Sequence, residues 1–195
     1  MKLATIHLLL ITALAYGTFA TSMSAQTCET PRWTQGPGPI PGGGYYEYIA
    51  NGQPTSANCW NLTGNVQVVQ VNDCGYFHDS DYAFNLHYGA RVSQEFIVPI
   101  NNTQTHWNLS YLLTMQDPNN DAWWNRLKVT VYDATAGKIL ASETYRGDNP
   151  DISCSPRKLT FPGDLSQHRL QVIFSDGSAY SNTVFHVRGI SLLQY

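Results

Sequence analysis

The segment 121–126, which follows a turn sequence at 117–120, carries the side chains best suited to chemistry in this chain. It reads Asp-Ala-Trp-Trp-Asn-Arg and so combines two tryptophans with a carboxylate, an amide and a guanidinium. A sugar ring presents apolar C–H faces to an aromatic platform and hydroxyls to polar groups, so a sugar site needs this combination. The segment is therefore predicted to bind carbohydrate.

The alternation of the strand that follows distinguishes the two tryptophans. Trp123 is in phase with Leu127, which is expected to be buried, whereas Trp124 is in phase with the outward positions of that strand. Trp124 is therefore the predicted platform, and the alternative is that both tryptophans pack as a lid on the core. The predicted ligand-binding residues are Asp121, Trp123, Trp124, Asn125, Arg126 and Tyr132.

The sequence lacks the common catalytic motifs. It contains no G-x-S-x-G, no H-E-x-x-H, no phosphate-binding loop and no dinucleotide fingerprint. A glycosidase needs two carboxylates facing each other across a cleft, and Glu47 with Glu95 is the pair to consider. The sequence favours binding without catalysis, while a small polysaccharide hydrolase or lyase remains an alternative.

The composition limits the class of partner. Charged residues make up 13% of the chain and aromatic residues 12%, and the net charge is −3. No cluster of Lys or Arg in the sequence is available to follow a nucleic acid backbone or to meet anionic lipid. We therefore expect a glycan or polysaccharide as partner, and neither nucleic acid nor a membrane.

The amino-terminal residues have the pattern of a secretory signal peptide. A basic start at Lys2 precedes an apolar run, and the small residues Thr18 and Ala20 stand at the cleavage positions. An uncleaved membrane anchor is disfavoured because no basic flank follows the apolar run. The expected organisation is a signal peptide at 1–20, a Gly/Pro-rich segment at 21–44 and one secreted domain at 45–195. An extracellular structural or adhesion protein is a further alternative.

Four cysteines in an exported chain predict two disulfides. Counting strand reversals favours the pairs Cys59–Cys154 and Cys28–Cys74, since the strand between Cys59 and Cys74 should separate these two residues. Local pairing of Cys59 with Cys74 becomes possible if residues 61–64 form a tight reversal. No C-x-x-C pair indicates a zinc site.

Period-two alternation of apolar residues recurs along the chain. The predicted strands are marked by residues 66–71, 82–88, 92–98, 107–115, 127–131, 139–141, 170–174 and 184–193. The turn at Gly89 is expected to join two of them in a hairpin, Trp107 and Trp60 are expected in the core, and no amphipathic helix appears. Eight or nine closely spaced strands predict an all-β fold, an antiparallel two-sheet sandwich of the jelly-roll type.

Three short motifs resemble the secreted carbohydrate-binding modules that have a galactose-binding-like jelly-roll fold. The first is Gly44-Tyr45-Tyr46-Glu47 followed by Trp60 and the valine strand at 64–69. The second is Asp81 to Leu86 leading to Val92-Ser93-Gln94-Glu95-Phe96, and the third is Ser181 to Leu192, which ends in the closing strand. The resemblance covers most of the chain after residue 44. It implies this fold and a carbohydrate ligand.

The same resemblance concerns a structural calcium ion. Members of the family often hold calcium with an early Glu and an acidic residue in the closing strand, but here Arg188 and Gly189 occupy the latter positions. Calcium requires several oxygen ligands, so no cofactor is expected and calcium is disfavoured. The resemblance implies instead an ion pair between Glu47 and Arg188; the alternative is a solvated Arg188, with a bulge at Gly189.

Overall fold

The computed structural model describes residues 28, 30–35, 44–72, 81–100, 104–116, 124–146, 154–178 and 183–195. These residues form twelve β-strands and no α-helix. The strands are β1 (Arg32–Gln35), β2 (Gly44–Glu47), β3 (Asn61–Thr63), β4 (Val66–Val71), β5 (Asp81–Leu86), β6 (Arg91–Ile97), β7 (His106–Gln116), β8 (Arg126–Asp133), β9 (Lys138–Arg146), β10 (Ser155–Pro162), β11 (Arg169–Asp176) and β12 (Val184–Gln194).

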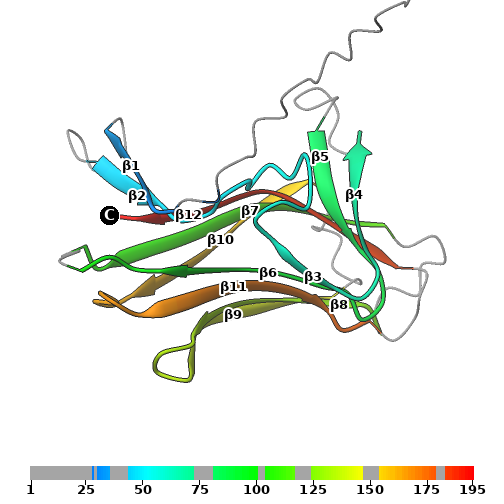
Figure 1. The fold of residues 1–195 in the computed structure, drawn as a ribbon. Coiled ribbons are helices and arrows are strands. Elements are labelled where there is room, and N and C mark those ends of the chain that lie inside the picture. Colours follow the sequence, from blue (N-terminus) through cyan, green and yellow to red (C-terminus); the bar gives the residue numbers. More distant parts are fainter. Residues whose placement is uncertain are drawn as a thin grey trace, which may run out of the picture.

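The strands build two antiparallel sheets that pack face to face, with the larger sheet above the smaller one in Figure 1. The seven-stranded sheet is organised around β12, which pairs with β2, β5 and β7. The five-stranded sheet has the order β3-β6-β11-β8-β9. The antiparallel two-sheet sandwich predicted from the sequence is confirmed.

Alternate residues of the strands meet between the sheets and form the core. Trp107, only 1% exposed, stacks on Phe161 with ring centroids 5.7 Å apart. Trp60 meets Phe84 edge to face at 5.1 Å. Both tryptophans are core residues, as their strand phase and position predicted, because burying large aromatic rings dominates the stability of such an interior.

A hydrogen bond between two hydroxyl groups also joins the two sheets. The Tyr111 hydroxyl of β7 lies 2.6 Å from the Tyr145 hydroxyl of β9, and Tyr145 donates to Glu143 at 2.6 Å. Burial raises the pKa of both tyrosines above the ordinary value. Both hydroxyls therefore stay protonated at neutral pH and keep the link between the sheets.

The segment between β2 and β3 is fixed to the five-stranded sheet by Gln94 of β6. The Gln94 amide accepts from Ala50 N at 2.8 Å and donates to the carbonyl oxygens of Ala50 and Cys59, each at 2.9 Å. A buried amide whose partners are backbone groups sets the position of a loop firmly, because each broken bond would leave a buried polar group unpaired. The segment 48–60 is thereby anchored to β6 at Ala50 and Cys59.

The central strand β12 contains a bulge. Its register against β7 shifts between Arg188 and Ser191, and Gly189 adopts a φ of 56°, in the left-handed region that glycine enters without strain. Residues in phase with Phe185 point inward before the bulge, and residues in phase with Leu192 point inward after it. Both halves of the strand therefore contribute to the core. The bulge considered at Gly189 is confirmed.

The segment 47–53 supplies acceptors for the N–H groups around the bulge. Ile190 N donates to Gly52 O at 2.9 Å, Gly189 N to Gln53 Oε1 at 3.2 Å and Leu192 N to Glu47 Oε1 at 2.9 Å. Gly52 has no room for a side chain, since a Cβ there would lie 1.8 Å from Ile190 O. The bulge and this segment therefore depend on each other.

Glu47 forms hydrogen bonds with both the bulge of β12 and the segment that follows β2. Its carboxylate accepts from Ile49 N at 2.9 Å, from Leu192 N and from the Ser191 hydroxyl. Burial raises the pKa of the Glu47 carboxyl above its usual range, although these hydrogen bonds act in the opposite direction.

The predicted ion pair between Glu47 and Arg188 is not among the contacts of the described residues. The bulge turns Ser191, rather than Arg188, toward the carboxylate. The alternative of a solvated Arg188 is wrong, because this side chain is only 2% exposed, on the outer face of β12 opposite Leu112.

The predicted disulfide pairs Cys59–Cys154 and Cys28–Cys74 are wrong. Cys28 is bonded to Cys59, with Cα atoms 5.3 Å apart. The reversal count failed because β1 and β2 form a hairpin and residues 48–60 lead back across the sandwich, which brings Cys59 to Cys28. Cys154 is also disulfide-bonded, and Cys74 lies outside the described residues.

Two further expectations need correction. The turn at Gly89 does not close a hairpin, because β5 belongs to the seven-stranded sheet and β6 to the five-stranded sheet; the chain crosses between layers there. The strands β1, β3 and β10 were not predicted, since each is short or contains proline, whereas β2 is the Gly44–Glu47 motif that the resemblance assigns to the first strand. The Gly/Pro-rich stretch 35–44 is expected to be a loop or an N-terminal wrap; its end residues belong to β1 and β2, and residues 36–43 lie outside the described residues.

We expect Glu47→Ala to lower the free energy of unfolding by about 2 to 5 kcal/mol, because the N–H groups of Ile49 and Leu192 lose their acceptor. Glu47→Gln keeps an acceptor for both N–H groups and should cost less than about 1 kcal/mol at neutral pH. Urea denaturation of the two variants measures the difference. Equal losses in both would show that the charge, and not the acceptor, stabilises the bulge.

The same two proteins give a pH dependence with a defined sign. Because the folded-state pKa of Glu47 is raised, its contribution to stability is fully present below the unfolded pKa and is lost as pH rises through the folded pKa. The wild type should therefore lose stability relative to Glu47→Gln as pH rises through the titration range of this carboxyl. Denaturation curves over that range test the sign.

Peptide mapping of the non-reduced protein should recover Cys28 joined to Cys59. We expect the second bond to join Cys154 to Cys74, the remaining cysteine of the sequence. Recovery of Cys59 joined to Cys154 would contradict the fold of the segment 48–60 described above.

Candidate functional site

A groove of about 340 Å³ crosses the outer face of the five-stranded sheet. Four neighbouring strands, β6, β11, β8 and β9, contribute the side chains that line it. The lining residues are Arg91, Lys128, Thr130, Tyr132, Ile139, Gln171, Ile173 and Ser175.

Strand register brings these residues together from distant parts of the sequence. The cross-strand rows are Arg91–Ser175–Lys128, Ile173–Thr130 and Gln171–Tyr132–Ile139. Neighbouring strands lie about 4.8 Å apart and successive rows on one face about 7 Å apart, so the three rows form a surface the size of a few sugar rings. The inward residues between them are core residues, which fixes the backbone of the groove.

The lining of the groove is both apolar and rich in hydrogen-bonding groups. Tyr132, Ile173 and Ile139, which is 53% exposed, provide the apolar part. Gln171 is oriented by its neighbours, since Arg91 Nη2 donates to Gln171 Oε1 at 3.3 Å and Gln171 Nε2 donates to Ser93 Oγ at 3.4 Å. The arrangement can receive the C–H face of a ring and bind its hydroxyl groups.

The structure places the predicted ligand-binding residues in different environments. Tyr132 lines the groove, and Arg126 is exposed on the same strand in the same outward phase. Trp124 lies directly before β8 and is 40% exposed. Asn125 is fully buried and is not accessible to a ligand. Asp121 and Trp123 lie outside the described residues.

The part of the groove that β6 and β11 supply was not predicted from the sequence. Arg91, Gln171, Ile173 and Ser175 occupy outward positions that alternate with buried residues such as Val172. That phase was visible in the sequence, but the adjacency of β6, β11 and β8 was not. Only the folded register shows that residues about position 91 face residues about position 175.

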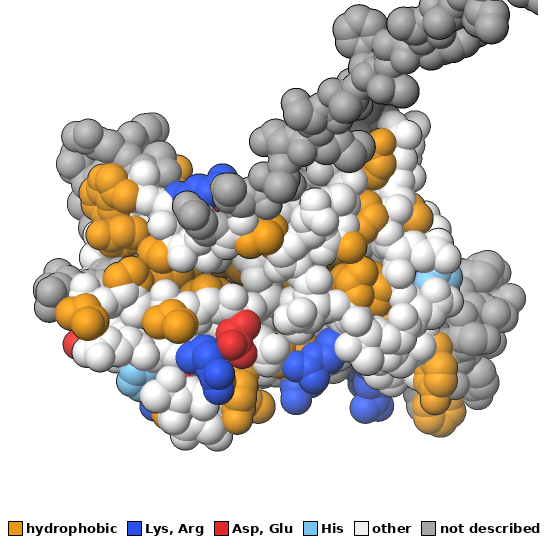
Figure 2. Space-filling view, viewed as in Figure 1, with side chains coloured by type: hydrophobic (Ala, Val, Ile, Leu, Met, Phe, Trp, Pro, Cys, Tyr) orange, Lys and Arg blue, Asp and Glu red, His pale blue; other side chains and the backbone are white. Residues whose placement is uncertain are grey.

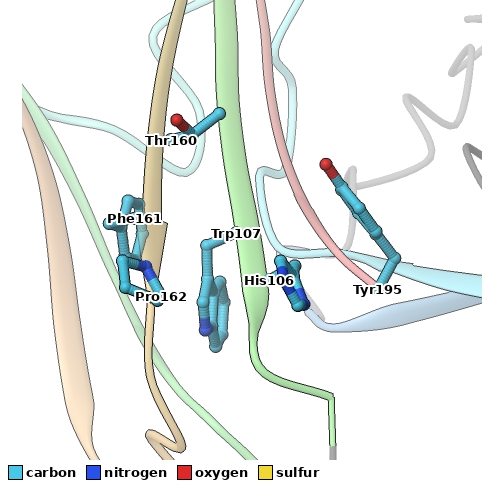
Figure 3. Close-up of a pocket in the computed structure, with 6 residues that line it drawn as sticks. All are labelled: His106, Trp107, Thr160, Phe161, Pro162 and Tyr195. Carbon is cyan, nitrogen blue, oxygen red and sulfur yellow. The ribbon is translucent and has the colours of Figure 1, made fainter.

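A second pocket, of about 290 Å³, lies at the end of the seven-stranded sheet where β7, β10 and the last residue meet. Figure 3 shows Phe161, Pro162 and Trp107 toward β10, and His106 and Tyr195 on the other side of β7. The rings of His106 and Tyr195 are stacked at 6.1 Å. Trp107 and Phe161 are core residues, whereas His106 and Thr160 are exposed.

A third pocket, of about 390 Å³, lies on the outer face of the seven-stranded sheet. It is rich in amides, including Gln70, Asn85 and Gln116, and His186 contributes its ring.

The carboxylates considered for catalysis do not face each other. Glu47 binds the bulge of the seven-stranded sheet, whereas Glu95 is on the outer face of the five-stranded sheet, 3.7 Å from Arg169 Nε. Within the described ranges, no three His, Cys, Asp or Glu side chains gather as a metal site would require. In the same ranges no helix reaches the length and apolar character needed to span a bilayer.

The comparisons with known proteins concern the fold. No family model and no curated protein matches the sequence. A solved family 61 carbohydrate-binding module in complex with β-1,4-galactotriose is similar in structure, with a TM-score of 0.57, 14% sequence identity, and coverage of 76% of this chain and 99% of that module. The jelly-roll sandwich predicted for this chain is thereby confirmed.

Two other solved structures are similar at lower TM-scores. A family 16 carbohydrate-binding module has a TM-score of 0.46 and 16% identity, with coverage of 74% of this chain and 97% of the module. The enzymatically active domain of bacteriophage CBA120 tailspike protein 4 has a TM-score of 0.48 and 16% identity, with coverage of 76% of this chain and 21% of that one.

We expect neither calcium nor a chelator to change the melting temperature of this protein. The Glu47 oxygens already accept hydrogen bonds from two backbone N–H groups and a hydroxyl, and a bound cation would have to displace these donors. Thermal melts with added calcium and with EDTA test the expectation. A calcium-dependent rise that Glu47→Gln abolishes would contradict it.

Proposed function

We propose that this chain is a secreted carbohydrate-binding domain, without catalysis of its own, that holds a glycan in the groove on the outer face of the five-stranded sheet. The observation that carries the proposal is the composition of that groove. Tyr132 and two isoleucines lie next to an oriented amide and two hydroxyl groups on one rigid surface.

The physical argument is one of matched surfaces. Moving a sugar ring out of water costs little free energy if its C–H face contacts apolar side chains and its hydroxyls form hydrogen bonds with the protein. Gln171 offers both, because an amide carries a carbonyl acceptor and an N–H₂ donor, and Thr130 and Ser175 add hydroxyl groups. These groups lie on β-strands and are already held in place, so little conformational entropy is lost on binding.

Trp124 and Arg126 extend this surface in the proposal. Arg126 is the first residue of β8 and Trp124 lies two residues before it; Arg126 is two residues from Lys128 in the outward phase. An exposed tryptophan at the end of a groove suits a further sugar unit, as the segment 121–126 suggested. The groove and the aromatic segment would then form one extended site.

The fold supports the proposal, since the solved module with the same architecture is described in complex with β-1,4-galactotriose. Secretion is supported by the pattern of residues 1–20 and agrees with the disulfide between Cys28 and Cys59, because such bonds persist in oxidising compartments.

Tyr132→Ala and Trp124→Ala should each weaken binding to a soluble polysaccharide by about 1 to 3 kcal/mol, while the melting temperature stays nearly unchanged. Affinity electrophoresis against a panel of polysaccharides identifies the ligand, and calorimetry then measures the variants. Tyr195→Ala, in the pocket of Figure 3, is the matched control and should bind as the wild type does.

Three outcomes would argue against this assignment. A loss confined to Tyr195→Ala would move the site to the second pocket. Release of new sugar ends from the bound polysaccharide would favour the hydrolase or lyase alternative. Binding to no polysaccharide, with intact folding, would favour a structural or adhesion role.

A further inference from the structure

We infer that the glycan in this groove is an acidic polysaccharide, whose carboxylate or sulfate groups are bound by Arg91 and Lys128. The inference rests on the proposed function and adds the chemical class of the ligand. It follows from where the positive charges of the five-stranded sheet lie and from what surrounds them.

The two cations stand on either side of one residue of the central strand. Ser175 of β11 pairs with Arg91 of β6 on one side and with Lys128 of β8 on the other. Both side chains line the groove. Two strand spacings separate their Cα atoms, which is about 10 Å, a distance that a disaccharide unit of an extended polysaccharide can span.

Neither cation is neutralised by a carboxylate of the described residues. Arg91 donates to the neutral amide of Gln171, and the described contacts contain no acidic partner for Lys128. Glu95, the carboxylate on the outward phase of β6, lies beside Arg169 at 3.7 Å. The groove therefore carries positive charge that a bound anion would offset.

The charge of this face is opposite to that of the whole chain. The chain has a net charge of −3, yet the outward phases of four strands bring cations to one surface. Figure 2 shows Lys and Arg side chains along the lower part of the molecule, where the five-stranded sheet lies. The outward cations are Arg91, Arg126, Lys128, Arg146 and Arg169.

The apolar part of the groove distinguishes a polysaccharide from a nucleic acid. Single-stranded nucleic acids are held by successive aromatic rings on which bases stack, along a continuous basic track. Here the lining offers one aromatic ring, Tyr132, together with Ile139 and Ile173, and Trp124 would add a ring only beyond the start of β8, not a continuous row of rings. Such a surface suits the C–H faces of sugar rings, and the two cations suit acidic groups along the same chain.

The test compares polysaccharides that share a backbone and differ in charge. Polygalacturonate and its fully methyl-esterified form isolate the carboxylate, and dextran sulfate and dextran isolate the sulfate. For at least one pair, we expect the acidic polymer to bind about tenfold or more tightly, and the pair that shows it identifies the acidic group. Raising NaCl from about 0.1 M to about 1 M, which shortens the screening length from about 10 Å to about 3 Å, should remove most of the difference.

The variants separate the groove from the rest of the surface. Arg91→Gln/Lys128→Gln should lose about tenfold or more in affinity for the acidic polymer and little for the neutral one. Lys158→Gln, an exposed lysine of β10 on the other sheet, is the matched control and should change neither. The melting temperatures of both variants, compared with that of the wild type, confirm folding.

The outcomes distinguish this inference from the proposed function. Equal, Tyr132-dependent binding of charged and neutral polymers would overturn the inference and leave the proposed function standing. An equal loss in Lys158→Gln, or binding of single-stranded DNA as tight as that of the acidic polymer, would overturn it as well. Binding to no polysaccharide would overturn both.

Discussion

The hydrogen bonds between the segment 47–53 and the bulge of β12 are the contacts on which the larger sheet depends. β12 has to pair with β7 along its length, with β5 at one end and with β2 at the other. A regular strand of eleven residues would have to keep one phase, whereas the bulge at Gly189 resets it. The bulge removes some backbone N–H groups from the hydrogen bonds between strands. These N–H groups donate instead to oxygen atoms of Glu47, Gly52 and Gln53.

This arrangement links the larger sheet to the groove on the smaller one. The segment that closes the bulge continues to Ala50 and Cys59, where Gln94 of β6 binds it. Gln94 faces inward on β6, while Arg91, Ser93 and Glu95 face outward on the same strand. The position of β6, and with it one side of the groove, is thus coupled to the closing strand through buried polar contacts.

The sequence predicted what depends on local alternation and missed what depends on contacts far apart in the chain. The strands with period-two patterns, the burial of Trp107 and the outward phase of Arg126 and Tyr132 were all readable from residues close in sequence. The disulfide of Cys28 could not be predicted in this way, because it depends on the path of residues 48–60 and not on a count of strands. The same limit applies to Gln171, whose neighbours in the groove are set by sheet order.

The alternation of faces along β8 and β11 also bears on how such a domain can change over evolutionary time. Groove residues such as Gln171 and Ile173 alternate with core residues such as Val172, and the two sets share a backbone but not a packing environment. Substitutions in the outward set can therefore alter which ligand is recognised at little cost in stability. In this sandwich the residues that determine ligand selectivity alternate with those that stabilise the fold. The two sets can therefore change independently during evolution.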